Sequence, residues 1–262
     1  MQSVPRRRFV FGLGATLVPG PCVLAQSSPG KAPLRVAAAS DMQFALKEIA
    51  KRFEAERGQT VLLQSGSSGN LARQIMQGLA VDIFFSADES FAFALADAGL
   101  TQGRGVRYGL GRLAWLVASR SDLMPDAGLA GLRAQLGSIK RLSIANPEHA
   151  PYGRAAREAL QRAGLWDLVQ PKLVLGENVA QAAQFVASGA AQAGIVSLSL
   201  ARVPEVAKVT RHALLDEDLH APLHQRLVIL KNAPPAAQAL VDFIARPDMR
   251  ELLRRHGLDD PR

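Results

Sequence analysis

Short apolar segments alternate with helical patterns along this chain, and the alternation limits the folds open to it. The first apolar segment is 34–39, and Met42, Leu46, Ile49 and Phe53 follow it at helical spacing. Strands and helices in such short alternation predict an α/β fold, with a parallel sheet covered by helices on both faces. Ligands of such sheets bind outside the carboxyl ends of the strands, so functional residues are expected there.

The pattern restarts in the middle of the chain, which predicts two α/β lobes with the second inserted in the first. An insertion of this kind needs two chain crossings, which we expect near 109–118 and 220–230. One lobe then consists of 34–112 with 225–262, and the other consists of 113–224. The further predicted strands are 61–63, 81–88, 113–118, 141–145, 173–175, 193–196 and 227–230.

The N-terminus has the three-part pattern of a secretory signal peptide. Three arginines at 6–8 precede an apolar stretch that is too short to span a bilayer, and paired arginines suggest the twin-arginine variety. We expect removal of 1–25 and a periplasmic mature chain without a membrane span. Cys22 suggests a lipoprotein signal, but Pro21 stands where that signal requires a small residue, so we expect cleavage after Ala25 rather than lipidation.

The charge of the mature chain argues against nucleic acid as a partner. The whole chain has 31 basic and 23 acidic residues, a net charge of +8. Three of the basic residues and none of the acidic ones lie in 1–25, so the mature excess is +5. It is spread along the sequence without the basic stripe typical of nucleic-acid binding. A mildly basic surface helps to attract small anions, and we expect a monomer.

Four predicted strand-to-helix junctions carry small or hydroxyl-bearing residues. The free N–H groups of a helix's first turn and its macrodipole favour an anion, and serine hydroxyls add neutral donors. The alternative role of such residues is helix capping and turn formation alone. The junctions are Ser40-Asp41, Ser67-Ser68, Pro151-Tyr152-Gly153 and Asn178-Val179.

Each predicted lobe contains two of these junctions, so lobes that face each other would bring four helix N-termini to one cleft. None of the named junction positions is a lysine or an arginine. A small, fully deprotonated oxyanion suits such a cleft, because it has only acceptors and neutral donors can satisfy each of its oxygens.

A serine hydrolase is the alternative from another class of protein. It would use Ser68 or Ser40 as the nucleophile, but the stretch 66–70 lacks the second glycine of a nucleophile elbow. His149 could serve as a base, but the sequence offers no evident partner acid, and a capping or surface role is expected for it.

Three histidines raise the question of a metal site. His212, His220 and His224 show no tetrahedral ligand set. The spacing of the last two instead fits an alternating strand with exposed imidazoles. No Walker-type phosphate loop occurs in the chain.

Five motifs together carry a resemblance to a known family. They are Ala37–Ser40, Gly66–Ile75, Asp82–Asp88, Asn146–Pro151 and Gly194–Val196. In order and spacing the chain resembles the periplasmic molybdate-binding proteins of ABC transporters (the ModA family) over nearly all of 34–258.

The resemblance implies a type II periplasmic-binding-protein fold, in which two α/β lobes joined by two crossover segments close on molybdate or tungstate. It implies an exported solute-binding protein, not an enzyme, that delivers the oxyanion to an ABC transporter permease. No cofactor is implied. Another tetrahedral oxyanion, such as sulfate, is the alternative ligand within this class.

The family's ligand positions fall on five residues of this sequence. Ser40 and Ser68 match its two hydroxyl donors, each with a nearby backbone N–H. Tyr152 and Val179 match positions that donate through the backbone. Asp41 is expected to contribute its N–H and to keep its carboxylate at the helix N-terminus or in solvent, because a carboxylate facing a dianion would repel it.

The sequence departs from the family after 194–196. Many members have a tyrosine there whose hydroxyl touches the oxyanion, whereas this chain has Ser197. The Tyr152 hydroxyl is a candidate compensating donor, with its ring covering the cleft. The alternative is that Tyr152 contributes its N–H alone.

Overall fold

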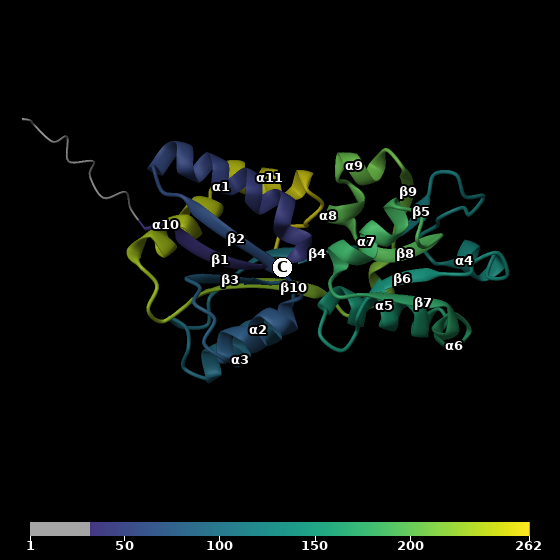
Figure 1. Ribbon diagram of the computed structural model, residues 1–262, viewed down its shortest axis with the longest axis horizontal. Coiled ribbons are helices and arrows are strands. Elements are labelled where there is room, and N and C mark those ends of the chain that lie inside the picture. Colours follow the sequence, from purple (N-terminus) through teal and green to yellow (C-terminus); the bar gives the residue numbers. More distant parts are fainter. Residues whose placement is uncertain (1–31, 262) are drawn as a thin grey trace, which may run out of the picture. The chain divides into compact units, whose positions relative to one another are not determined.

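The computed structural model describes residues 32–261, and the signal peptide predicted for 1–25 lies outside them. The described chain contains two five-stranded sheets, with the strand orders β2-β1-β3-β10-β4 and β7-β6-β8-β5-β9. Helices flank both sheets (Figure 1). The prediction of two α/β lobes is therefore confirmed. Lobe I denotes the first sheet with its helices, and lobe II denotes the second.

Lobe I combines the N-terminal strands with the C-terminal part of the chain. Gly58 ends its first helix in the left-handed conformation, as expected of a C-terminal glycine. The strands are β1 (Leu34–Ala39), β2 (Val61–Gly66), β3 (Ile83–Ser86), β4 (Val106–Gly111) and β10 (Leu223–Ile229). The helices are the 3-10 turn η1 (Ser40–Met42), α1 (Gln43–Arg57), α2 (Ser68–Met76), α3 (Glu89–Asp97), α10 (Pro235–Ile244) and α11 (Pro247–Arg255).

Alternate side chains of the central strands fill two separate cores on the two faces of the first sheet. In β1, Val36 packs with α1, α10 and α11, whereas Ala37 packs with α2 and α3. In β3, Phe85 lies in the first of these cores and Phe84 in the second. Because both faces are covered, the strands keep their register, and the ends of β1 and β2 lie side by side.

Lobe II has a single core in which Trp115 is fully buried. No helix in residues 32–261 is both long and apolar enough to cross a membrane. The strands of lobe II are β5 (Leu113–Ala118), β6 (Leu142–Ala145), β7 (Leu173–Gly176), β8 (Ala193–Ser197) and β9 (Thr210–Leu214). Its helices are α4 (Ala130–Ala134), α5 (Pro151–Arg162), α6 (Trp166–Val169), α7 (Val179–Ala187), α8 (Leu198–Ala201) and α9 (Pro204–Ala207), with the 3-10 turns η2 (Gln170–Lys172) and η3 (Glu217–Leu219).

The parallel arrangement expected from the alternation holds for most strands, but each sheet also contains one strand that runs antiparallel to its neighbours. β10 is antiparallel to β3 and β4, and β5 is antiparallel to β8 and β9. These are the strands by which the chain enters a lobe: β5 follows β4 after Arg112 alone, and β10 follows η3. The chain enters each lobe at the carboxyl ends of its parallel strands. The entering strand is therefore antiparallel to them.

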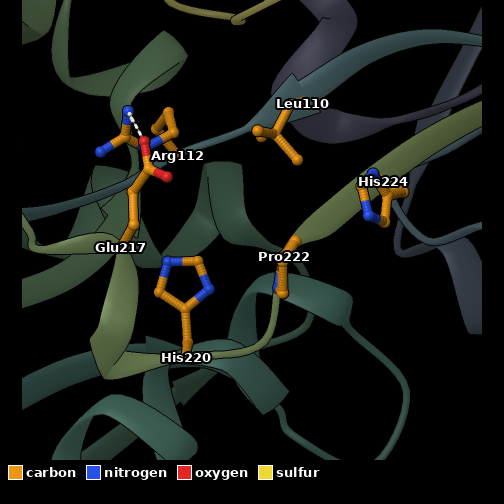
Figure 2. A pocket seen from close by; sticks show the side chains of 7 residues that line it. Leu110, Arg112, Glu217, His220, Pro222 and His224 are labelled. Atoms are coloured by element: carbon orange, nitrogen blue, oxygen red, sulfur yellow. Dashed lines mark ion pairs between the residues drawn. The ribbon is translucent and has the colours of Figure 1, made fainter. Parts of the chain in front are cut away.

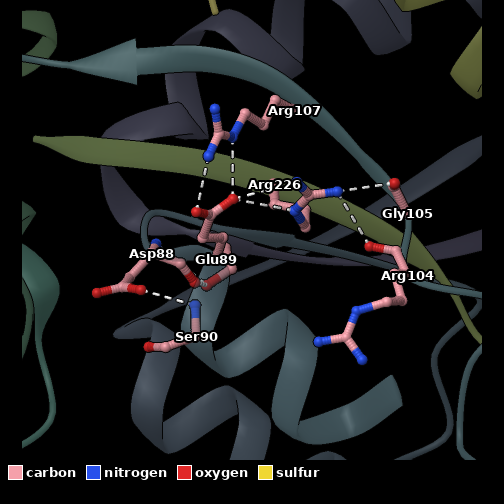
Figure 3. Close-up of polar contacts among 8 residues, drawn as sticks. Asp88, Glu89, Ser90, Arg104, Gly105, Arg107 and Arg226 are labelled. Atoms are coloured by element: carbon pink, nitrogen blue, oxygen red, sulfur yellow. Dashed lines mark hydrogen bonds and ion pairs between the residues drawn. The ribbon is translucent and has the colours of Figure 1, made fainter. Parts of the chain in front are cut away.

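The start of α3 is fixed to lobe I by ion pairs of Glu89. Its carboxylate accepts from Arg107 of β4 at 2.9 and 3.0 Å and from Arg226 of β10 at 3.1 Å (Figure 3). Hydrogen bonds from Arg107 are the largest cause of the low pKa of Glu89, which falls to about 2. The cluster holds the turn between β3 and α3 against two other strands.

Candidate functional site

The four predicted junctions lie at the carboxyl ends of strands in both lobes. η1 and α2 follow β1 and β2, whereas α5 and α7 follow β6 and β7. Two contacts join the lobes here. The amide of Ala180 in α7 lies 3.3 Å from Ser40 Oγ, and the amide of Gly69 in α2 donates to the carbonyl of His149 at 3.0 Å. The structure is therefore a closed form in which these helix starts approach one another.

Ser40 and Ser68 are placed to donate hydrogen bonds. Both are buried. Ser68 Oγ accepts from the amide of Ala87 at 3.0 Å, and Ser40 Oγ accepts from that of Ala180. A hydroxyl oxygen that accepts from a backbone N–H keeps its own proton for another acceptor. Each serine can therefore donate one hydrogen bond to an oxygen of a bound anion.

Ser67 caps α2, and the amide of Ser68 remains available as a donor. Ser67 Oγ accepts from the amide of Asn70 at 3.4 Å, as an N-cap side chain does. The amide of Gly69 is taken by His149. Within the described chain the amide of Ser68 has no acceptor. The serine–glycine stretch thus provides both a helix cap and a free donor.

In lobe II, α7 is capped by Asn178. Its Oδ1 accepts from two first-turn amides at 3.0 and 3.1 Å. The amide of Val179, the first residue of the helix, meets no acceptor among the residues that the structure describes. In α5, Pro151 has no N–H, so Tyr152 carries the first amide of that helix.

The carboxylate of Asp41 is buried, so the expectation of a place in solvent was wrong. Asp41 is 2% exposed, and its Oδ2 accepts from the Tyr152 hydroxyl at 2.9 Å and from Gln225 Nε2 at 2.7 Å. Burial raises the pKa of Asp41, and these two hydrogen bonds offset part of the rise. The other expectation, a place at a helix N-terminus, agrees with its position in the first turn of η1.

The Tyr152 hydroxyl is also committed within the protein. Its proton goes to Asp41, and its oxygen accepts from Gln225 Nε2 at 3.0 Å. These contacts favour the alternative in which Tyr152 contributes its N–H alone. Ser197, which stands in place of that tyrosine, caps α8 by accepting from the amide of Leu200 at 3.3 Å.

Ser67, His149 and Glu177 form a serine–histidine–acid series that the sequence did not suggest. Ser67 Oγ lies 2.8 Å from His149 Nδ1, and His149 Nε2 lies 3.7 Å from a carboxylate oxygen of Glu177. A hydrolytic triad needs an accessible nucleophile and an acid within hydrogen-bond distance. Ser67 is only 4% exposed, and the 3.7 Å between His149 and Glu177 is too long for a hydrogen bond. The series therefore acts as a contact between the lobes.

Two further polar pairs join the lobes. Asn70 of α2 donates to Glu177, and Arg154 of α5 pairs with Asp88, the residue before α3. Burial raises the pKa of Asp88, but hydrogen bonds from Arg154 and Ser90 outweigh it and lower the pKa overall. Because their partners lie on different lobes, these pairs add to the stability of the closed form.

A cavity of about 60 Å³ lies where the chain crosses between the lobes (Figure 2). It includes none of the predicted site residues. His220 is buried and His224 is half-buried, so the expectation of exposed imidazoles was wrong. In residues 32–261 no group of three His, Cys, Asp or Glu residues could hold a metal ion. The cavity is lined by Leu110, Gly111, Arg112, Glu217, His220, Pro222 and His224.

Two α/β lobes whose facing helix starts carry hydroxyl and amide donors are typical of a solute-binding protein. Residues 34–259 match the family described as bacterial extracellular solute-binding protein, and the chain belongs to this family. This class confirms the expectation of a non-enzymatic protein.

Named relatives and a solved structure support the same class. The chain is 35% identical to the molybdate-binding protein ModA of Azotobacter vinelandii, over 98% of each chain. It is 34% identical to ModA of Rhodobacter capsulatus, over 84% of this chain and 86% of that one. The solved periplasmic molybdate-binding protein of Azotobacter vinelandii matches with a TM-score of 0.80 and 29% identity, over 87% of this chain and 100% of that one. The resemblance and the type II periplasmic-binding-protein fold are confirmed.

Sequence reasoning missed Gln225, which contacts both Asp41 and Tyr152. The alternation of β10 gave a signal, because Leu223, Gln225 and Leu227 are buried while the residues between them are partly exposed. An amide on the buried phase of a strand requires hydrogen-bond partners.

Proposed function

We propose that this protein captures molybdate or tungstate between its lobes. The proposed donors are the hydroxyls and amides of Ser40 and Ser68 and the amides of Asp41, Tyr152 and Val179. The proposal rests mainly on the hydroxyl protons of these two serines. Each serine oxygen already accepts from an amide, and its own proton remains available to donate to an anion.

The names of the relatives support the choice of anion. Proteins called molybdate-binding align with this chain over nearly its whole length. Molybdate and tungstate have nearly the same size and charge, and we propose that both bind. A different tetrahedral dianion, such as sulfate, remains the competing ligand because it offers the same acceptors.

We also propose the cellular role. The protein is exported to the periplasm, acts as a monomer without a cofactor, and delivers the oxyanion to the permease of an ABC transporter. The family and the leader at 1–25 support this role. We propose lobe boundaries at 34–112 with 225–262 and at 113–224. The division of the strands between the two sheets supports them, except that Leu223 and His224 already belong to β10 of the first sheet.

A calorimetric screen of molybdate, tungstate, sulfate and phosphate tests the proposal. Molybdate and tungstate should bind with similar affinity and more tightly than sulfate. Hydrogen phosphate should bind far more weakly near neutral pH, because its hydroxyl would lack an acceptor in a site of donors. Tight sulfate binding without molybdate binding would replace the proposed ligand. The parent protein could instead bind phosphate and molybdate with comparable affinity, and Asp41→Asn could lose phosphate binding alone. Asp41 would then be an acceptor for the phosphate hydroxyl.

A further inference from the structure

Asp41, Tyr152 and Gln225 form a buried hydrogen-bonded cluster that the proposed ligand contacts do not use. The three residues come from η1, α5 and β10. Tyr152 belongs to lobe II, whereas Asp41 and Gln225 belong to lobe I. All three are buried, Gln225 completely. The cluster therefore crosses the boundary between the lobes at the same helix starts that carry the proposed amide donors of Asp41 and Tyr152.

Each donor proton of the cluster has a partner inside it. The Tyr152 hydroxyl donates to Asp41 Oδ2, and Gln225 Nε2 donates to the same oxygen and to the Tyr152 oxygen. A primary amide has two protons and a phenol has one, so the three hydrogen bonds use all of them. The ring is complete only while Tyr152 is docked against lobe I.

Two acceptors of the cluster oppose closure. Gln225 Oε1 is buried without a partner in the described chain, and Asp41 Oδ1 has none beyond the backbone amides of Asp41 and Met42, which act to lower the pKa of Asp41. An acceptor that loses water and gains no partner disfavours the buried state. These two oxygens therefore offset part of the stabilisation that the three hydrogen bonds give to the closed form.

We propose that these three residues form an interlobe clasp that slows release of the bound anion, with Gln225 as the positioning residue that orients both the carboxylate and the phenol. This inference rests on the proposed binding of an oxyanion between the lobes. It also assigns Tyr152 two separate roles, one for its amide and one for its hydroxyl.

Gly111 at the end of β4 supports the close fit of the clasp. A Cβ atom at this position would lie 2.9 Å from Gln225 Nε2 and would collide with the Tyr152 hydroxyl. Glycine leaves room for both groups beside the crossing from lobe I to lobe II. Because the clasp fills this space completely, even a methyl group added there would displace it.

The two tyrosines of the described chain form a matched pair for the test. Tyr108 is also buried, and its hydroxyl donates to the carbonyl of Ser86 at 3.2 Å within lobe I. Tyr152→Phe and Tyr108→Phe therefore remove the same atom from similar surroundings. Only the first removes a bond between the lobes.

The experiment measures association and dissociation rates of molybdate, and of sulfate as a second anion, by stopped flow on the full chain. Tyr152→Phe should raise the dissociation rate roughly ten- to a hundredfold, as expected for losing a hydrogen bond to a charged group. The association rate should stay unchanged, because the clasp forms after the encounter. Gln225→Met should act in the same direction, and Tyr108→Phe should change neither rate.

The outcomes separate this proposal from the choice of anion. Parent protein that binds sulfate but not molybdate refutes the proposed ligand, and the clasp is then judged on sulfate rates. Equal dissociation rates for parent, Tyr152→Phe and Gln225→Met refute the clasp while molybdate binding stands. If Tyr108→Phe raises the dissociation rate as much as Tyr152→Phe does, the clasp is also refuted, since the effect would then reflect general destabilisation.

Discussion

Individual residues at the facing helix starts differ in the kind of hydrogen bond that they can still make. Ser40 and Ser68 accept from backbone amides and keep a proton to donate. The one acidic side chain among the proposed site residues, that of Asp41, is occupied by Tyr152 and Gln225. A site built in this way offers donors to a dianion and keeps its negative charge engaged elsewhere, which suits a ligand that carries no proton.

Removing one serine hydroxyl should weaken anion binding without unfolding the protein. Ser40→Ala or Ser68→Ala loses a hydrogen bond to a charged group, worth about 1.5–3 kcal/mol, so the affinity for molybdate should fall roughly ten- to a hundredfold. Titration calorimetry measures the change. Ser143→Ala is the control, because Ser143 is a fully buried serine of lobe II whose hydroxyl has no partner in the described chain. Unchanged molybdate affinity in both cleft variants would place the site elsewhere.

The elements of the fold differ in how well the sequence predicted them. Apolar runs such as 34–39 and 113–118 were predicted as strands and are strands, because, apart from the exposed Arg35, their residues are apolar and almost all buried. β4 and β9 were missed, since Val106–Gly111 contains an arginine and two glycines and Thr210–Leu214 is largely exposed. Strand direction depends on how the chain enters a lobe, which local sequence does not encode.

The candidate site was predictable only in part, for a related reason. Helix starts leave free amides whatever the rest of the fold, so Ser68 and Val179 could be named from local pattern and family resemblance. The partners of Asp41 could not be named, because Tyr152 lies 111 residues away and Gln225 lies 184 residues away in the sequence. Contacts at such separations depend on how the two lobes close.

At the scale of an element, α3 should make an acid-sensitive contribution to stability. The pKa of Glu89 is about 2 in the folded protein against an ordinary value of 4.5. Its ion pairs therefore stabilise the fold fully above 4.5, and this contribution is lost as the pH falls from 4.5 toward 2. After allowance for solvent screening, Glu89→Gln should remove about 1–2 kcal/mol of unfolding free energy at neutral pH and much less near the acid limit.

Denaturant unfolding across this pH range measures the effect of Glu89→Gln. Glu205→Gln is the control, because Glu205 is an exposed acid of α9. It should change stability little at any pH. A Glu89→Gln deficit that stays constant from neutral to acid pH would show that its effect is not electrostatic.

For the whole molecule, the closed form depends on close approaches that no single lobe requires. Contacts from Ser67, Gly69, Asn70 and Asp88 of lobe I reach the segments around α5 and α7 of lobe II. The exposed pair of Asn70 with Glu177 contributes little by itself. The sum of these contacts, together with the clasp and the anion, decides the balance between open and closed forms, and a ligand shifts that balance only by binding one form better.

Gly69 gives a direct way to block closure, since its added Cβ would meet the backbone of the other lobe more closely than the Phe91 ring of its own lobe, which lies at 3.1 Å. A Cβ atom at Gly69 would lie 2.6 Å from the carbonyl oxygen of His149, a backbone atom of the other lobe. Gly69→Ala should therefore lower molybdate affinity roughly tenfold or more, as expected from overpacking of about 1–3 kcal/mol. Gly66→Ala is the matched control, since the three atoms nearest to its added methyl group all belong to the Leu71 side chain of its own lobe. Small-angle scattering with saturating molybdate should show a larger radius of gyration for Gly69→Ala than for the parent and for Gly66→Ala. If Gly69→Ala binds and compacts like the parent, the approach of α2 to the loop before α5 is not required for closure.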